Sequence, residues 1–266
     1  MYPAERRRAI LAEAQSGDGR VSVARLSAHL GVTYATIRRD LDDLEREGLL
    51  RRQHGGARLV RTLPFELSLP VRTATEQEER GRIADAVVRL LPADGVVLLD
   101  SGALMLSVAE RFPDDRELMV VTNNLPAARL LGAKKRLTVL TLPGRVRRLT
   151  QATVDETARA RLDGLRVDRA LIGANGVTVE SGATTTIPAE AAVKRAMIDA
   201  ADRSVLAVTA SKFGQVSFCR FAELDEFEHI LTDDRLDDAT RREFAGAGAD
   251  LTVVPAASAP APEPAP

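Results

Sequence analysis

The sequence contains one cysteine, no tryptophan and no long hydrophobic run. With Cys219 alone, a disulfide within the chain is impossible and a zinc site with several thiolate ligands is disfavoured. A helix that crosses a membrane needs about 20 consecutive apolar residues, and apolar runs such as 96–99 are far shorter. The first eight residues include arginines, but no uninterrupted apolar segment follows them, as a signal peptide requires. These absences favour a cytoplasmic protein with no membrane partner.

Lysine is also scarce, because 33 of the 37 basic residues are arginine. Residues 1–60 contain 11 arginines against 8 acidic residues, a net charge of +3, whereas residues 61–266 carry a net charge of −4. Arginine makes bidentate contacts to phosphate and to guanine, so the basic start favours nucleic-acid binding; a codon bias toward arginine is the alternative explanation. The length of 266 residues and the opposite charges favour two domains with separate tasks.

The first 59 residues have the pattern of a winged helix-turn-helix. Apolar residues recur at helical spacing in three segments, with glycine-containing turns between them. Ser22 and Thr33 are suitable N-caps for the second and third segments. A strand, a glycine turn and a second strand follow over 49–59. We therefore predict an α+β domain over 1–59, with helices over 3–15, 22–30 and 34–47.

The third helix is the expected DNA-reading element. Its start, residues 33–39, combines small hydrogen-bonding side chains with two arginines, which suits a helix that enters the major groove. Arginines beside the glycine turn suit a wing that binds backbone phosphate. A generic helical hairpin is the alternative interpretation. The candidate DNA-binding residues are Ser22, Thr33, Tyr34, Thr36, Arg38, Arg39, Arg51, Arg52, His54 and Arg58.

The rest of the chain alternates short β-rich runs with helical stretches. Residues 60–80 contain two prolines and no sustained period, which predicts a linker, and the Ala/Pro tail over 256–266 is expected to be disordered. The alternation predicts an α/β domain over 81–255 with a mostly parallel sheet. The predicted strands are 96–99, 118–121, 137–142, 170–172, 205–208, 229–231 and 251–254. The predicted helices are 104–111, 126–131, 154–161, 188–201 and 238–245.

Small polar residues and glycines follow five of the predicted strands. In an open α/β sheet, ligands bind beyond the carboxyl ends of the strands, and glycines let backbone N–H groups approach an anion. With Lys212 as a point charge, these loops predict a pocket for a small polyhydroxylated, phosphorylated ligand; ordinary turn formation is the alternative. The loops begin at residues 100, 122, 143, 173 and 209.

Groups suited to catalysis are poorly placed. None of the three histidines falls in one of these loops, which disfavours a histidine-based triad or metal site. Proton transfer between a carboxylate and Lys212, as in a sugar-phosphate isomerase, is the enzymatic alternative. Glu190 and Lys194 are four residues apart and are expected to pair on a helix surface. We expect no enzymatic activity, no cofactor and no bound metal.

The order of motifs resembles the DeoR family of bacterial transcription regulators. In the first part the resemblance rests on the runs 32–41, 44–49 and 52–57, and in the second part on 100–102, 120–123, 173–176, 190–197 and 211–214. It covers nearly the whole chain, from about Pro3 to Pro255. It implies a winged helix-turn-helix joined to a sensor domain similar in fold to ribose-5-phosphate isomerase and CoA-transferase domains.

The resemblance also implies a function. Members of the family usually repress sugar-metabolism genes, bind a double-stranded DNA operator as dimers or tetramers, and are released by a phosphorylated sugar. On this basis the effector-binding residues are Asp100, Ser101, Gly102, Asn123, Gly144, Asn175, Gly176, Lys194 and Lys212.

The sequence departs from the family pattern around this expected site. Ala103 and Leu104 stand where threonines are usual, Pro143 replaces the first of two glycines, and an acidic residue is replaced within 209–210. A site with fewer polar partners discriminates differently or binds more weakly. A regulator whose sensor binds no sugar phosphate is therefore a second alternative.

Overall fold

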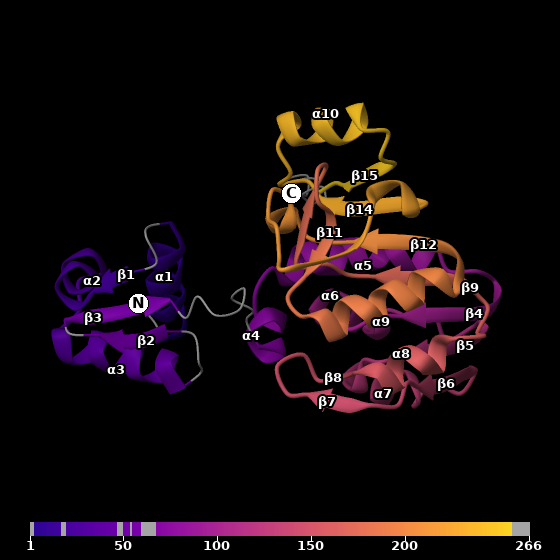
Figure 1. Cartoon of the computed structure of the whole chain (residues 1–266), viewed down its shortest axis with the longest axis horizontal. Coiled ribbons are helices and arrows are strands. Elements are labelled where there is room, and N and C mark those ends of the chain that lie inside the picture. The colour runs from indigo at the N-terminus through magenta and orange to yellow at the C-terminus, as the bar shows by residue number, and fades with distance from the viewer. Residues whose placement is uncertain (1–2, 17–19, 47–49, 54, 60–67, 257–266) are drawn as a thin grey trace, which may run out of the picture. The chain divides into compact units, whose positions relative to one another are not determined.

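The computed structural model describes residues 3–16, 20–46, 50–53, 55–59 and 68–256. The chain divides into two units, residues 1–65 and 66–266 (Figure 1). Several predictions lie outside the described residues: the candidate contact His54, the part of the linker over 60–67 and the tail over 257–266.

The first unit combines three helices with a small antiparallel sheet among its described residues. The predicted helices are confirmed as α1 (Pro3–Ser16), α2 (Val23–Leu30) and α3 (Tyr34–Arg46), and the strand pair as β2 (Leu50–Gln53) and β3 (Gly56–Leu59). An additional strand, β1 (Arg20–Ser22), gives the sheet order β1-β3-β2. Ser22 precedes α2 with an extended backbone, as the last residue of β1, and its side chain makes no capping hydrogen bond.

Apolar side chains from all three helices fill the core of this unit. Ile10, Leu26, Ile37 and Leu41 are fully buried, in agreement with the helical spacing of the sequence. A buried ion pair fastens α1 to α3, because Arg6 donates two hydrogen bonds to Asp40, Nε to Oδ2 at 2.5 Å and Nη2 to Oδ1 at 3.0 Å.

Glycine at position 56 lets two strands of this sheet come together. A Cβ atom there would lie 1.9 Å from the carbonyl oxygen of Val21. Any side chain at this position would therefore push β3 away from β1.

The second unit is built on a seven-stranded parallel sheet, which confirms the predicted α/β fold class. Its order is β15-β14-β12-β9-β4-β5-β6, and its strands correspond one by one to the seven that the sequence predicts. Their bounds are β4 (Asp94–Leu99), β5 (Glu117–Thr122), β6 (Leu137–Thr141), β9 (Val167–Ile172), β12 (Ala201–Ala207), β14 (His229–Asp233) and β15 (Leu251–Val254).

Alternate residues of the strands enter two separate cores, one on each face of the sheet. Leu98, Ala170 and Leu206 pack on one face, whereas Leu99 and Leu171 pack on the other. The first face is covered by α8 (Glu156–Leu162), α9 (Pro188–Asp199) and an antiparallel sheet of β10 (Gly176–Thr178), β11 (Gly182–Thr185) and β13 (Cys219–Ala222), with Phe244 of α10 (Asp238–Gly246) in the same core. The second is covered by α5 (Gln77–Arg89), α6 (Ala103–Glu110) and α7 (Leu125–Leu131) (Figure 1).

The short antiparallel strands of this unit escape sequence-based prediction. The strands β7 (Arg145–Arg147), β8 (Ala152–Val154), β10, β11 and β13 have three or four residues each, too few for a recognisable alternation. The helix predicted over 154–161 begins at Glu156, since Asp155 accepts hydrogen bonds from the N–H groups of Thr157 and Ala158 and caps it. The described part of the predicted linker contains α4 (Leu69–Thr73) and the first turn of α5.

The buried pair of Arg6 and Asp40 leads to a stability prediction. Asp40→Asn removes the carboxylate that accepts two hydrogen bonds from the buried Arg6 guanidinium and should destabilise the first unit by about 3–5 kcal/mol. Asp43→Asn is the matched control, because the Arg7–Asp43 pair spans 3.7 Å and is partly exposed, and it should cost less than about 1 kcal/mol. Hydrogen exchange of peptides from α1 and α3 measures both. Equal protection in the two variants would contradict the prediction.

Candidate functional site

Four of the ten predicted DNA contacts lie on the first turns of α3, and Thr33 directly precedes this helix. Thr33 Oγ1 accepts a hydrogen bond from the Thr36 N–H at 3.2 Å, and the two hydroxyl oxygens lie 2.9 Å apart, so Thr33 caps the helix. Tyr34 is 54% exposed, and Arg38 and Arg39 are exposed as well. Neither arginine has an acidic partner within the described residues. The start of α3 therefore presents two unpaired cations to an external anion.

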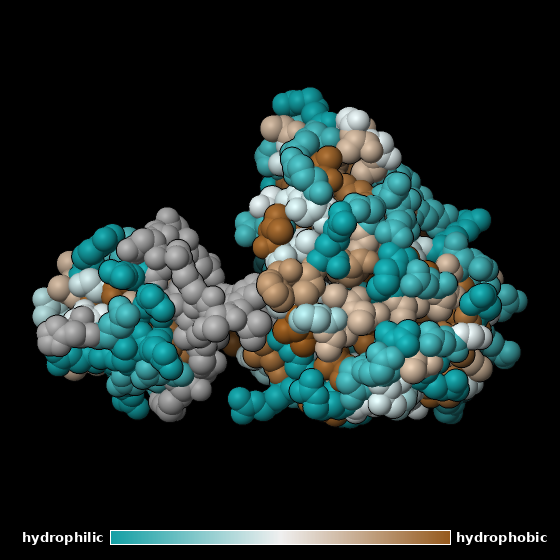
Figure 2. Space-filling model, viewed as in Figure 1, coloured by the Kyte–Doolittle hydropathy of each residue, from teal (hydrophilic) through white to brown (hydrophobic). Residues whose placement is uncertain are grey.

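Three arginines stand in a row across the small sheet. The strand register places Arg58 of β3 opposite Arg20 of β1 and Arg51 of β2, and all three are exposed. Directly paired residues point to the same face, where like charges repel unless an anion lies between them. Arg20 was not among the predicted contacts, and only the strand register reveals it. Figure 2 shows that the visible part of this unit is predominantly hydrophilic.

Arg52 points to the opposite face of the same sheet. It pairs with Ala57 in the register, and its Nε lies 3.3 Å from Asp42 Oδ1 on α3. Its backbone N–H donates to Glu45 Oε1 at 2.8 Å. These contacts join β2 to α3, so the structure does not bring Arg52 together with Arg51 and Arg58.

In the second unit, a buried ion pair lies at the carboxyl ends of the central strands. Asp100, directly after β4, is 1% exposed. Its Oδ2 accepts hydrogen bonds from Lys194 Nζ of α9 and from the N–H of Gly173 at 3.0 Å. Lys194 also donates to the Gly173 carbonyl at 2.9 Å, and its Nζ lies 5.4 Å from the centre of the Phe221 ring. Lys194 is thus held by protein groups.

Two buried acceptors at this edge lack partners. Asp100 Oδ1 and Asn123 Oδ1 accept no hydrogen bond from any described residue, although Asn123 Nδ2 donates to the Thr153 carbonyl at 3.3 Å. The register puts the ends of β4 and β5 side by side. An unpaired buried acceptor is costly, so this edge favours a bound molecule with hydroxyl donors.

Two further predicted residues frame this edge. Ser101 is buried. Gly102 has φ +111°, which favours glycine, and a Cβ there would meet nothing within 4 Å. Its conformation therefore leaves open space at the start of α6.

Other predicted residues have structural partners of their own. Thr185 Oγ1 donates to Asn175 Oδ1 at 2.9 Å. A Cβ at Gly176 would lie 2.2 Å from the Gln215 carbonyl oxygen, and one at Gly144 would lie 2.8 Å from Asp155 Oδ1. Lys212 is half-buried at the end of the 3-10 helix η1 (Ala210–Lys212). For these glycines, close packing by itself explains the absence of a side chain.

The predicted surface ion pair between Glu190 and Lys194 is wrong. Both side chains are buried, and Glu190 pairs instead with Arg147 Nη1 at 2.9 Å and accepts a hydrogen bond from Thr150 at 3.1 Å. The i,i+4 spacing allowed the pair, but each residue faces a stronger partner from another element. Sequence reasoning gave no signal for Arg147, because its strand β7 was not predicted.

Glu76 forms a third cluster, on loops at the ends of β12 and β14. Its backbone is left-handed, with φ +50° and ψ +38°, a conformation that strains a non-glycine residue. Its carboxylate accepts hydrogen bonds from Thr209 Oγ1 at 3.1 Å and Ser211 Oγ at 3.3 Å, and from Arg235 Nη2 at 2.7 Å. Side-chain contacts therefore hold the turn between α4 and α5 against the loop that contains Lys212.

Arg235 also binds Asp233, the last residue of β14. Burial raises the pKa of the Asp233 carboxyl, but the Arg235 guanidinium and the Ala210 N–H lower it, and the result lies below the ordinary value. Asp233 therefore stays ionised at neutral pH and keeps Arg235 in place.

One unit carries an exposed helix with arginines, and the other has buried polar groups at its strand ends. This combination is typical of a ligand-responsive transcriptional regulator. Residues 6–62 match the model of the DeoR-like helix-turn-helix domain, and residues 75–234 match that of the DeoR C terminal sensor domain. The chain belongs to the DeoR family of transcriptional regulators, which are not enzymes.

Relatives of the same length support this assignment. The chain is 39% identical over 254 residues to the HTH-type transcriptional regulator GlpR of Haloferax volcanii, covering 96% of this chain and 98% of that protein. It is 30% identical over 217 residues to the glycerol-3-phosphate regulon repressor of Escherichia coli K12, covering 81% and 85%. A solved ribose 5-phosphate isomerase A from Methanocaldococcus jannaschii is similar over 52% of this chain and 55% of its own, with 16% identity and a TM-score of 0.38.

Two kinds of feature are missing from the described ranges. No helix in them combines the length and the apolarity that a membrane crossing requires. The same residues contain no group of three or more His, Cys, Asp or Glu side chains arranged to hold a metal ion.

The strand-end ion pair generates the second stability prediction. Lys194→Met leaves the Asp100 carboxylate buried without its counter-ion and should cost about 3–5 kcal/mol in the free energy of unfolding. Lys134→Met removes a pair with Asp114 in which the lysine is partly exposed and the aspartate is exposed, and it should cost less than about 1 kcal/mol. Urea denaturation followed by far-UV circular dichroism compares the two. A cost for Lys194→Met as small as the control's would show that the pair is not structural.

Proposed function

We propose that this protein is a cytoplasmic repressor of carbohydrate-metabolism genes that binds operator DNA as a homo-oligomer and is released by a phosphorylated sugar or a similar small anion. The observation that carries the DNA-binding part is the pair of exposed, unpaired arginines at the start of α3, Arg38 and Arg39. Phosphates and guanine edges are the anionic and acceptor groups that such arginines bind best.

In this proposal α3 enters the major groove. Tyr34, Thr36, Arg38 and Arg39 contact bases and phosphates, while Thr33 caps the helix and directs its N-terminal N–H groups toward a phosphate. The row of Arg20, Arg51 and Arg58 binds backbone phosphate, with Ser22 on the same strand as Arg20. The predicted contact His54 lies outside the described residues. Arg52 acts indirectly, because its contact with Asp42 fixes the wing strand on α3.

The effector site lies beyond the ends of β4, β5 and β9. Its support is the pair of buried acceptors without partners, Asp100 Oδ1 and Asn123 Oδ1, which match the hydroxyl donors of a sugar. Ser101, Gly102 and Lys212 complete the site, with Lys212 as the cation for a phosphate. Lys194 positions Asp100, and Asn175, Gly144 and Gly176 shape the surrounding loops. The Escherichia coli relative is a glycerol-3-phosphate regulon repressor, which agrees with a phosphorylated polyol as effector.

Coupling between the two functions runs through Glu76. This residue lies within the predicted linker region, 60–80, and its carboxylate holds Thr209 and Ser211. A ligand that moves the loop of Lys212 must change these hydrogen bonds. The strained backbone of Glu76 is then free to relax, which alters the start of α5 and with it the path to the DNA-binding unit.

The test of the regulator is a genomic DNA pull-down with purified protein, followed by sequencing of the bound fragments. Sharp enrichment at a few sites supports the proposal, and the genes beside them name the metabolites to try as effectors. Uniform recovery of all fragments, with and without sugar phosphates, contradicts it. Turnover of a pentose or hexose phosphate by the pure protein would support the isomerase alternative instead.

Arginine substitutions separate base reading from phosphate binding. Arg38→Ala should weaken operator binding by about 1–3 kcal/mol and relax the preference at one base position. Arg58→Ala should weaken all DNA sequences alike and reduce the slope of log K against log salt concentration by about 1. The control is Arg25→Ala, an exposed arginine on α2. Fluorescence anisotropy with operator and scrambled duplexes gives all three results, and unchanged affinity and specificity in Arg38→Ala would rule out α3 as the reading helix.

Glu76→Gln tests the coupling. The variant keeps the size of the side chain but weakens the charge-assisted bond to Arg235. We expect effector binding by the sensor to persist within a few-fold, while the effector's ability to lower operator affinity falls. Isothermal titration measures the first quantity and anisotropy the second, with the exposed Glu78→Gln as control. Full effector-induced release in Glu76→Gln would show that the coupling takes another route.

A further inference from the structure

Arg80 is a buried cation without a counter-ion. It lies on α5, is 4% exposed, and donates from Nη2 to the Thr73 carbonyl at 2.9 Å. Its Nε has no hydrogen-bond partner, and no carboxylate of the described residues comes within ion-pair distance of it. This contrasts with Arg6 and Lys194, each of which contacts a buried aspartate.

More distant charges do not compensate for this burial. Burial lowers the pKa of the Arg80 guanidinium below its ordinary value and is the largest influence on it. Glu76, Glu79 and Glu110 raise this pKa and Arg72 lowers it, and the net shift stays downward. A buried charge is normally paired. The missing partner therefore points to an anion that comes from outside this unit.

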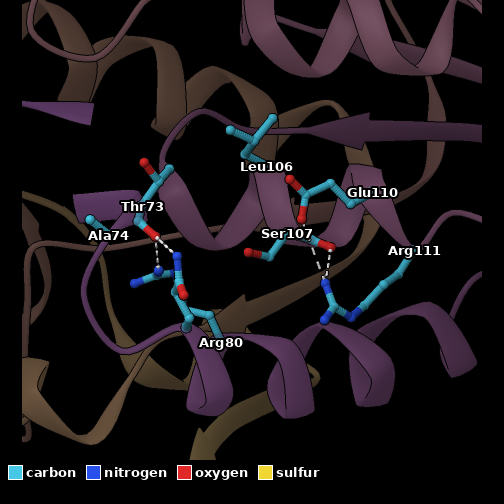
Figure 3. Close-up of a pocket in the computed structure, with 8 residues that line it drawn as sticks. Thr73, Ala74, Arg80, Leu106, Ser107, Glu110 and Arg111 are labelled. Carbon is cyan, nitrogen blue, oxygen red and sulfur yellow. Dashed lines mark hydrogen bonds and ion pairs between the residues drawn. The ribbon is translucent and has the colours of Figure 1, made fainter. Parts of the chain in front are cut away.

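Arg80 is one of the residues that line a cavity of about 330 Å³. Thr73, Gln77 and Arg80 line it from α4 and α5, Ser107 and Glu110 line it from α6, and Arg111 lines it from the position directly after α6 (Figure 3). Its volume falls at the lower end of the range for small-molecule sites, about 300–1,000 Å³. None of these residues belongs to the proposed effector site at the strand ends.

A second arginine, Arg111, lines the same cavity. A Cβ at Gly81 would lie 2.8 Å from Arg111 Nη2, so Arg111 lies directly against α5 beside Arg80. Arg111 already has partners, with its Nε 3.0 Å from Asp85 Oδ1 and its Nη1 3.7 Å from Glu110 Oε2. Arg80 is therefore the cation that still needs an anion, and Arg111 is an additional donor.

We propose that this cavity between α4, α5 and α6 is a second anion site, which binds phosphate or a small phosphate monoester with Arg80 as its principal cation. The planar guanidinium matches the tetrahedral oxyanion through parallel N–H donors. Ser107 and Gln77 line the same space, and Gln77 Nε2 donates to the Thr73 carbonyl at 3.1 Å. The carboxylate of Glu110 repels further negative charge, which favours a single phosphate over a polyphosphate chain. The site is independent of the proposed effector site and of DNA binding.

Equilibrium dialysis with labelled inorganic phosphate, at fixed ionic strength set by chloride, tests this site. The variant is Arg80→Met, which keeps the length of the side chain and removes its charge. Arg82→Met is the matched control on the same helix, since Arg82 pairs with Asp234 at 2.9 Å. Asn123→Ala removes a side chain of the strand-end site. We expect Arg80→Met to weaken phosphate binding about tenfold or more, as loss of a charged hydrogen bond does, and the other two variants to keep it.

Three outcomes would overturn the proposal. They are equal phosphate binding by Arg80→Met and the unchanged protein, loss of binding in Asn123→Ala alone, and no saturable binding by the unchanged protein at millimolar phosphate. The second outcome would assign the phosphate to the strand-end site. Because each variant is read separately, failure of this site and failure of the proposed effector site are distinguishable.

A second substitution tests the site even if Arg80→Met fails to fold. Ser107→Leu fills the cavity from α6 and leaves Arg80 in place, so it should reduce phosphate binding as well.

Thermal unfolding adds an independent measurement. Phosphate should raise the melting temperature of the unchanged protein but not that of Arg80→Met, whereas without phosphate the variant should be at least as stable, since an uncompensated buried charge has been removed. Equal phosphate-induced shifts in both proteins would contradict the proposal.

Discussion

The buried ion pair between Asp100 and Lys194 joins elements that lie far apart in the sequence. It connects the end of β4 to α9, and both residues also bind the backbone of Gly173 after β9. A buried charge that loses its partner is strongly destabilising, so the strand ends and the helix keep a fixed spacing. With this spacing, Asp100 Oδ1 and Asn123 Oδ1 are buried at the neighbouring ends of β4 and β5. Neither atom has a hydrogen-bond partner among the described residues. The proposed effector site depends on that geometry, although Lys194 itself is occupied by protein groups.

The start of α5 carries contacts both to the loops at this edge of the sheet and to the cavity beside α6. Its first turn follows Glu76, whose strained backbone is held by Thr209, Ser211 and Arg235, and one turn later it carries Arg80 above the cavity with α6. The end of the predicted linker region therefore carries two charged residues, Glu76 and Arg80, that contact other residues of the second unit. In the proposed mechanism, only the contacts of Glu76 couple effector binding to the DNA-binding unit, and the Arg80 site is independent of that coupling.

The DNA-binding unit contains two groups of arginines, one that forms ion pairs within the fold and one that is exposed. Arg6 and Arg52 bind Asp40 and Asp42 and hold the helices and the wing together, whereas Arg38 and Arg39 on α3 have no acidic partner among the described residues. Charges that the fold does not use are available to an external anion. In the proposed function these two arginines bind DNA, where the backbone phosphates are anions and the guanine edges are hydrogen-bond acceptors.

The sequence alone determined the class of the protein and the course of both folds. Helical spacing located α1 to α3, and strand–helix alternation located all seven strands of the parallel sheet, because these patterns follow from which face each element buries. The tertiary structure decided what single residues do. Glu190 and Lys194 have the spacing of a surface pair, yet each binds a residue brought close by another element, Arg147 or Asp100. Arg20 joins the arginine row only through strand register, and Arg80 differs from other arginines only by its burial. Ion-pair choice, register and burial depend on contacts between distant segments, which no local pattern encodes.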